Sequence, residues 1–346
     1  MILADNHSKE SINKIRNQHF KGKDPQLIEK ILKALTLLEL LAQEKVPFTF
    51  KGGTCLLLLL KTPQRFSIDL DLIVTQKNNL LQALERICKN VPMFTRIDED
   101  VRTESKIPKA HYKVFYKSDM NDKEAYILVD LIEDSSPYPS TIASEIRPNY
   151  FQISAPYHVV TTPSIDGILG DKLTAFAPRT TGIKLKSRKE MEIAKQLFDV
   201  ASLFDHANDF EEVKKAFILV ASKEIKYREL NLSHEDVLLD SFDAAQTIAL
   251  RGTYKPEIHT ELQDGISRLK GYIFQPFGDR EAHLCAAKVA YLTQALLKTN
   301  FSITKYAGEN VGEMKIAHGD YNKLNKIKGI SPEAFWYWKQ AIDLII

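Results

Sequence analysis

Two aspartates interrupt an apolar segment early in the chain, in the string SIDLDLIV at residues 67–74. Because successive side chains of a strand point to opposite faces, Asp69 and Asp71 are expected on one face and the apolar residues beside them on the other. Two neighbouring carboxylates repel each other, so ionisation of both is disfavoured unless a cation lies between them. The string predicts either a strand edge facing solvent or a site for a divalent cation, and by itself it favours neither.

A third acid ends the apolar run of the string YILVDLIED, residues 126–134. If a strand there lies beside residues 67–74, Asp130 reaches the same cation. Three acids can hold two metal ions roughly 3.5–4 Å apart, which clamp the attacking and leaving oxygens of phosphoryl chemistry. We therefore favour a metal site over an ordinary strand-end acid, with Asp69, Asp71 and Asp130 as ligands of Mg²⁺ or Mn²⁺.

A glycine pair and a threonine, Gly52, Gly53 and Thr54, precede a predicted helix upstream of the aspartates. Glycine lets backbone N–H groups approach a phosphate closely, and a helix N-terminus adds favourable partial charge. Most glycine pairs are plain turns, so the prediction depends on their position between two expected strands. We expect these residues to steady the phosphates of a nucleotide.

The composition places few limits on function but sets the class of protein. Apolar residues make up 44% of the 346 positions, and the net charge of +2 is too small to indicate nucleic-acid binding by itself. The three cysteines, Cys55, Cys88 and Cys285, form no C-x-x-C pair and indicate a reducing compartment. The polar N-terminal stretch is not typical of a secretory signal, and the run Leu56–Leu60 is far shorter than the roughly 20 residues of a membrane helix. We expect a cytoplasmic protein without membrane association.

The pattern of elements changes near residue 160. Before it, helices are expected at 24–44, 54–61 and 79–88, and strands at 46–51, 67–74, 111–117 and 125–132. After it, helices are expected at 162–177, 187–205, 210–227, 234–250, 281–297 and 332–345, with an S-x-x-E capping box at residue 187. The sequence predicts an α+β domain over residues 1–160, with a mixed β-sheet and flanking helices, followed by an all-helical domain over residues 161–346.

A lysine lies on the apolar stripe of the first helix of this second domain, in the string SIDGILGDKLTAFAP. Lys172 would be destabilised there by desolvation unless its ammonium extends to solvent or meets an anion, and we favour the phosphates of a triphosphate. Asp199, on the flank of the next helix, is placed to contact Lys172 or an acceptor group. A solvated helix acid is an equal alternative for Asp199 from the pattern alone.

The segment between these two helices, RTTGIKLKSRK at residues 179–189, is rich in basic residues. A solvated loop accounts for this segment without further explanation. A second interpretation is that it binds the triphosphate or an RNA backbone, where lysine and arginine gain affinity by releasing counterions.

Two strings, K-G-G-T-x-L at Lys51–Leu56 and R-x-S-x-D-L-D-L at Arg65–Leu72, together resemble the nucleotidyltransferase superfamily. More narrowly, they resemble its AbiEii branch, the toxins of abortive-infection and type IV toxin–antitoxin systems. AbiEii-like proteins also carry a D-K-L-x-A lysine and then a helix aspartate, and Lys172 and Asp199 match these positions. The matches cover a small share of the chain, but the combined pattern is much more specific than its parts.

The resemblance implies an enzyme that transfers a nucleotide from an NTP to an acceptor hydroxyl and requires Mg²⁺ or Mn²⁺. It implies an RNA acceptor, the 3′ end of tRNA, with growth arrest as the outcome and a cognate antitoxin as a partner. The expected catalytic residues are Asp69, Asp71, Lys172 and Asp199. The expected nucleotide-binding residues are Gly52, Gly53, Thr54, Arg65, Ser67 and Lys172.

Two other functions stay open. An enzyme of the same fold can adenylylate a small molecule or a protein side chain, and a non-catalytic module can bind nucleotides or a partner. The intact acids and Lys172 count against the module, because a protein without catalysis has no need of destabilising buried charges.

Overall fold

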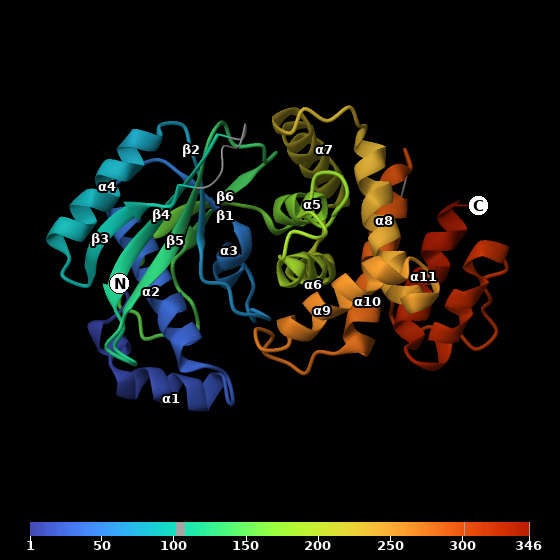
Figure 1. The fold of residues 1–346 in the computed structure, drawn as a ribbon, viewed down its shortest axis with the longest axis horizontal. Coiled ribbons are helices and arrows are strands. Elements are labelled where there is room, and N and C mark those ends of the chain that lie inside the picture. The colour runs from blue at the N-terminus through green and yellow to red at the C-terminus, as the bar shows by residue number, and fades with distance from the viewer. Residues whose placement is uncertain (102–107, 301, 346) are drawn as a thin grey trace. The chain divides into compact units, whose positions relative to one another are not determined.

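The computed structural model describes residues 1–101, 108–300 and 302–345. The chain divides into two compact units (Figure 1). The N-terminal unit consists of Met1–Ser136 with Ser140–Ser164, and the C-terminal unit consists of Pro137–Pro139 with Ile165–Ile346.

A mixed β-sheet forms the centre of the N-terminal unit, as predicted. Among the described residues it has seven strands, in the order β3-β4-β5-β2-β1-β7-β6. The pairs β2–β5 and β1–β7 are parallel, and the other neighbours are antiparallel. The strands are β1 (Thr49–Lys51), β2 (Leu70–Val74), β3 (Phe94–Glu99), β4 (Lys109–Lys117), β5 (Glu124–Glu133), β6 (Thr141–Glu145) and β7 (Val159–Pro163).

The helices of this unit flank the sheet (Figure 1). They are η1 (Ala4–His7), α1 (Lys9–His19), α2 (Pro25–Gln43), α3 (Gly52–Leu59) and α4 (Lys77–Asn90). The start of α2 follows the prediction: the Asp24 side chain accepts from the backbone N–H of Gln26, and Pro25 occupies the first helical position. The apolar residues of α2 are buried, and this helix contacts β5 and α4.

The C-terminal unit is helical. It contains α5 (Ile165–Ala175), α6 (Glu190–His206), α7 (Phe210–Tyr227), α8 (His234–Leu250), η2 (Arg251–Thr253), α9 (Pro256–Leu269), α10 (Asp279–Leu297), η3 (Gly319–Gly329) and α11 (Pro332–Ile345). The buried helix α10 packs against α6, α8 and α11. Helices α7, α8 and α11 begin and end at the predicted residues, whereas α9 was not predicted. No helix in the described part of the chain is both long and apolar enough to cross a membrane.

Two predicted helix starts are wrong. Thr162 and Pro163 end strand β7, where they pair with β6, and α5 begins only at Ile165. The expected capping box at Ser187 is absent, because the Ser187 hydroxyl donates to the carbonyl of Lys184 and α6 begins at Glu190. A capping box does open α8, where Ser233 and Asp236 exchange hydrogen bonds with each other's backbone N–H.

His7, the last residue of η1, is buried and contacts α2. Its Nε2 lies 3.3 Å from Thr36 Oγ1, and its Nδ1 has no hydrogen-bond partner among the described residues. Burial, helped by the positive charge of Lys33, lowers the pKa of His7 from 6.5 to about 4. The folded protein therefore holds this imidazole neutral at pH values where the unfolded chain protonates it.

We expect the free energy of unfolding to fall as the pH is lowered from 6.5 towards 4, because the unfolded chain binds this proton more readily. The full shift corresponds to roughly 3 kcal/mol. In urea titrations at a series of pH values, His7→Gln should flatten this part of the acid dependence. The exposed His19 provides the control, since His19→Gln should keep the wild-type slope; an equally steep curve for His7→Gln would contradict the assignment.

Candidate active site

Two of the three acids of the predicted metal site lie in strands. These two acids are direct neighbours in the sheet. Strands β2 and β5 pair in parallel, with Asp71 opposite Asp130. The sequence left open whether these strands are neighbours, and the structure shows that they are. Partners in register point to the same face, and neighbouring strands lie about 4.8 Å apart. Asp71 and Asp130 therefore share the half-exposed face of the sheet, while the residues before and after them are buried on the opposite face.

A histidine extends this row of side chains onto the next strand. His111 of β4 pairs in register with Asp130, and its Nδ1 lies 2.6 Å from Asp130 Oδ1. On the other side, Lys51 of β1 lies opposite Asp71. Sequence reasoning missed His111, although the alternation of HYKVFYK already placed it on the same face as Lys113 and away from the buried residues. The contact fixes the orientation of Asp130 whichever atom carries the proton.

Asp69 occupies a different place from the one predicted. Strand β2 begins at Leu70, so Asp69 lies just before the strand, and strand alternation does not fix the direction of its side chain. Within residues 1–101, 108–300 and 302–345, no group of three or more His, Cys, Asp or Glu side chains is arranged to hold a metal ion. The structure thus pairs Asp71 with Asp130, and metal binding by the three acids stays a prediction.

Gly52 makes room for the Asp71 carboxylate. A Cβ placed on Gly52 would lie 2.0 Å from Asp71 Oδ2, and the residue has a left-handed φ of +79°. Both features require glycine. Because Gly52 begins α3, the Asp71 carboxylate lies against the positive end of this helix, where negative charge is favoured.

The other predicted nucleotide-binding residues of the N-terminal unit gather around Gly53. A Cβ there would lie 2.6 Å from Ser67 Oγ and 2.7 Å from Arg65 Nη2. Thr54 donates from Oγ1 to Ser67 Oγ over 3.0 Å. Arg65 is buried, and its Nη1 donates to the carbonyl of Phe66. The start of α3 therefore combines small residues, a hydroxyl pair and a buried guanidinium.

Lys172 and Asp199 form a buried ion pair within the C-terminal unit. The Lys172 Nζ of α5 lies 3.0 Å from Asp199 Oδ2 of α6, and the two side chains are 9% and 1% exposed. The same ammonium donates to Gln196 Oε1 over 3.1 Å. Of the partners predicted for Lys172, Asp199 is the one that the structure shows. Gln196 gave no signal in the sequence.

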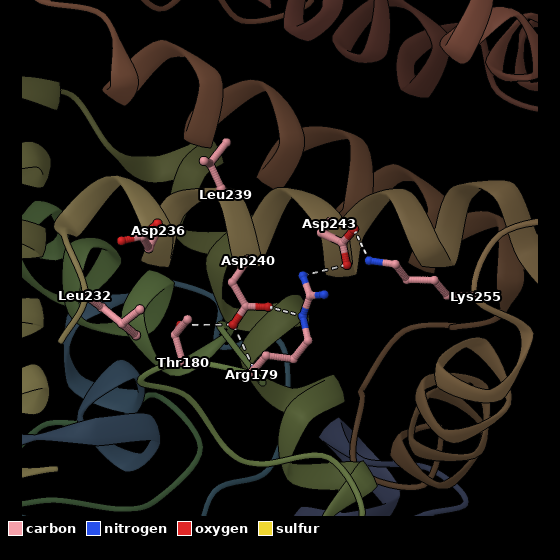
Figure 2. Close-up of a pocket in the computed structure, with 8 residues that line it drawn as sticks. All are labelled: Arg179, Thr180, Leu232, Asp236, Leu239, Asp240, Asp243 and Lys255. Carbon is pink, nitrogen blue, oxygen red and sulfur yellow. Dashed lines mark hydrogen bonds and ion pairs between the residues drawn. The ribbon is translucent and has the colours of Figure 1, made fainter. Parts of the chain in front are cut away.

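Arg179, from the basic segment between α5 and α6, lines a cavity of about 500 Å³ in the C-terminal unit (Figure 2). The other lining residues are Thr180, Leu232, Asp236, Leu239, Asp240, Asp243 and Lys255. The Arg179 guanidinium lies between Asp240 and Asp243 of α8. The remaining basic residues of the segment, Lys184, Lys186, Arg188 and Lys189, are exposed.

Residues 36–270, more than half of the chain, match the family model described as "Nucleotidyl transferase AbiEii toxin, Type IV TA system". The chain belongs to the AbiEii family. The resemblance seen in the sequence is thereby confirmed, and all of its motif residues lie within the matched range. No curated protein matches the chain.

Two solved structures are similar to this AbiEii chain. JHP933 from Helicobacter pylori is 18% identical, with 80% of this chain and 93% of that chain covered and a TM-score of 0.46. An antigenic nucleotidyltransferase-like protein from Paracoccidioides brasiliensis is 15% identical, with 58% and 91% covered and a TM-score of 0.37. The family assignment rests on the sequence match and not on these likenesses.

We expect Gly52→Ala to destabilise this AbiEii protein more than Gly22→Ala. Both glycines have a left-handed φ, +79° and +80°, but no described atom lies within 4 Å of a Cβ on Gly22. Backbone strain alone costs about 1–2 kcal/mol, and the clash with Asp71 adds about 1–3 kcal/mol at Gly52. Chemical denaturation of both variants measures the difference, and equal losses would show that the Asp71 carboxylate does not pack on Gly52.

Removal of one partner of the Lys172–Asp199 pair should lower the free energy of unfolding. Asp199→Ala leaves a buried ammonium without its carboxylate, and we expect a loss of about 3–5 kcal/mol in the free energy of unfolding. The double variant Lys172→Met/Asp199→Leu should regain most of this loss, because neither charge is then buried. If the double variant were as unstable as Asp199→Ala, packing rather than charge would dominate at this place.

Proposed function

We propose that the protein transfers a nucleotide from an NTP to a hydroxyl group at the 3′ end of tRNA, with Mg²⁺ or Mn²⁺ required. The observation that carries the proposal is the in-register pair Asp71 and Asp130 beside the start of α3. Membership of a family of nucleotidyltransferase toxins supports the reaction class.

The donor set of this pair fits a hard divalent cation. Carboxylate oxygens are the protein ligands that Mg²⁺ prefers, and its remaining positions are filled by water and phosphate oxygens. Asp71 and Asp130 point to one face, and Asp69 precedes Asp71 by two residues. When bound, the cation would neutralise charge on the triphosphate and lower the pKa of the attacking hydroxyl.

The protein residues around the pair have separate tasks in the proposed reaction. His111 holds Asp130 in orientation through the 2.6 Å contact. The backbone N–H groups of Gly53 and Thr54, at the start of α3, steady phosphate oxygens, and the buried Arg65 adds positive charge. Ser67 donates to a phosphate oxygen, since its own oxygen already accepts from Thr54. Catalysis is then mainly positioning and electrostatic stabilisation.

Lys172 and Asp199 complete the proposed set, in a helical domain that we propose to extend over residues 161–346. The Lys172 ammonium would neutralise the pyrophosphate that leaves, and Asp199 would hold this ammonium in place through the 3.0 Å contact. We also propose that the protein acts in the cytoplasm, where it meets its RNA acceptor and a cognate antitoxin. The family's place in type IV toxin–antitoxin systems supports the antitoxin partner.

We expect label from an NTP to appear on a tRNA-sized band when the protein is incubated with total cellular RNA and Mg²⁺. Asp71→Asn should reduce this transfer at least about 100-fold, because the neutral amide no longer attracts the cation. Asp69→Ala should also lose activity. Asp98→Asn, an exposed aspartate of the edge strand β3, is the control and should transfer at the wild-type rate.

The same experiment separates the alternatives. Four separate incubations, one for each labelled NTP, identify the nucleotide. Label on protein or on a small molecule but not on RNA would overturn the RNA acceptor and retain the transferase. Metal-dependent NTP binding that is lost in Asp71→Asn, without any transfer, would instead indicate a non-catalytic nucleotide-binding module.

A further inference from the structure

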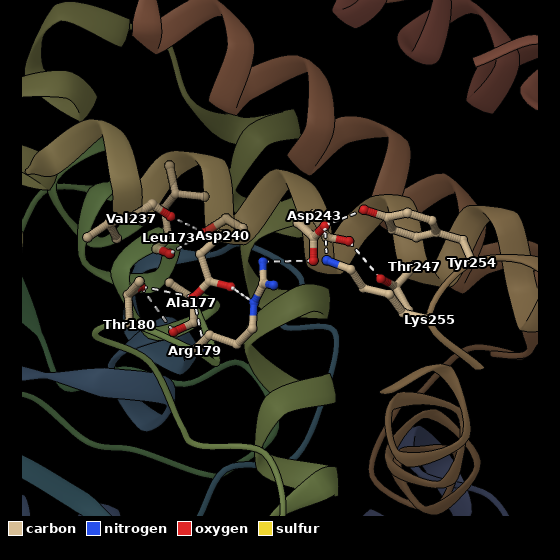
Figure 3. A network of polar contacts seen from close by, with 11 residues as sticks. Leu173, Ala177, Arg179, Thr180, Val237, Asp240, Asp243, Thr247, Tyr254 and Lys255 are labelled. Carbon is tan, nitrogen blue, oxygen red and sulfur yellow. Dashed lines mark hydrogen bonds and ion pairs between the residues drawn. The ribbon is translucent and has the colours of Figure 1, made fainter. Parts of the chain in front are cut away.

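The end of α5 is attached to α8 through Arg179. Arg179 donates twice to one carboxylate: its backbone N–H lies 2.8 Å from Asp240 Oδ2, and its Nε lies 2.9 Å from Asp240 Oδ1. Thr180 Oγ1 also donates to Asp240 Oδ2, over 2.9 Å (Figure 3). Asp240 is only 3% exposed. A buried carboxylate with three donors holds the turn after α5 in one position.

The same guanidinium reaches a second carboxylate. Arg179 Nη2 lies 2.8 Å from Asp243 Oδ2, while Tyr254 Oη donates to Asp243 Oδ1 over 2.6 Å. Lys255 Nζ also contacts Asp243 Oδ1. Among the polar residues of the cavity in Figure 2, all but Asp236 therefore bind one another, and Asp236 binds Ser233. This arrangement is that of a fixed network and not of a site that awaits a ligand.

The last turn of α5 is held by further contacts. Thr181 Oγ1 donates to the carbonyl of Thr174 over 2.9 Å, and Ser241 Oγ of α8 lies 3.4 Å from the carbonyl of Leu173. Gly182 packs closely, since a Cβ there would lie 2.5 Å from the carbonyl oxygen of Ala175. These contacts join the turn and α8 to the residues that immediately follow Lys172.

Lys172 belongs to the helix whose end this attachment holds. It lies in the last turn of α5, and Arg179 belongs to the segment that links α5 to α6, the helix of Asp199. The Lys172 ammonium stays in contact with the Asp199 carboxylate only while α5 and α6 are held at a fixed distance.

We propose that Arg179, through Asp240 and Asp243, is a positioning residue that keeps the Lys172 ammonium paired with Asp199. Its effect on turnover rests on the proposed function, whereas its effect on the ion pair does not.

The choice of arginine follows from the two acids. Asp240 and Asp243 are three residues apart on one face of α8, and a planar guanidinium can reach both at once. A lysine carries the same charge on a single nitrogen and lacks this fork. Arg179→Lys should therefore resemble Arg179→Gln and not the wild type.

Competitive acetylation of lysines in the full chain, quantified by mass spectrometry, tests the effect on the ion pair without any substrate. Acetylation requires an accessible amine, so the buried Lys172 should be labelled slowly in the wild type. In Arg179→Gln and Arg179→Lys we expect labelling of Lys172 to rise about tenfold. Lys288, which is buried and paired with Asp205 and Glu333, is the internal reference and should not change.

Arg268→Gln is the matched control. Arg268 also contacts two acids, Glu190 of α6 and Asp264 of α9, but its side chain is 58% exposed and neither acid belongs to the turn after α5. Lys172 labelling should stay at the wild-type rate in this variant. If Lys172 in Arg179→Gln were acetylated at the wild-type rate, the proposal would be overturned. A parallel rise in the acetylation of Lys172 and Lys288 would also overturn it, because it would show general loosening of the fold.

Turnover gives a second readout. For Arg179→Lys we expect kcat to fall roughly 10–100-fold while KM for the NTP stays within about twofold. A displaced Lys172 ammonium lowers the rate of the chemical step but leaves ground-state binding of the NTP nearly unchanged. A rise in KM at constant kcat would contradict a positioning role. If the wild type transfers no nucleotide, the proposed function fails, and the acetylation result still decides the proposal about Arg179.

Discussion

The parallel pairing of β2 with β5 is the constraint on which the candidate site depends. It places Asp71 beside Asp130, and two like charges at this spacing oppose folding unless their surroundings compensate. The structure compensates each acid separately. Asp71 lies against the start of α3, in a space that exists because residue 52 is glycine, and Asp130 contacts His111. Gly52 and His111 thus help the sheet to hold its acids, before any ligand is considered.

Buried charges in the C-terminal unit are also compensated by side chains of neighbouring segments. Lys172 lies on an apolar helix stripe, and its cost of burial is offset by Asp199 and Gln196 of the neighbouring helix. Asp240 is also buried, and Arg179 offsets it from the turn after α5. Each buried charge therefore has a partner on a different helix or segment. Such pairs add little net stability, but they allow only one arrangement of the helices that carry them.

The sequence predicted those features that depend on local pattern. Long amphipathic helices such as α7, α8 and α11 were correct at both ends, because their apolar periodicity is set by residues three and four apart. The apolar runs around Asp71 and Asp130 were sufficient to predict two strands, but not that these strands are neighbours. Strands β3, β6 and β7 were missed. All three are short, and β3 and β6 are also largely exposed and lack a clear alternation. The roles of His111 and Gln196 depend on contacts between distant segments, which no local pattern encodes.

The Lys172–Asp199 pair is compatible with a role for Lys172 in binding phosphate. An ammonium has three N–H donors and no acceptor. Among the described residues, Asp199 and Gln196 account for two of these donors. A phosphate oxygen can take the third without breaking the ion pair, so Lys172 does not have to exchange one anion for another. In this arrangement Asp199 and Gln196 hold the lysine in place, and the cost of burying its charge is offset before a substrate binds.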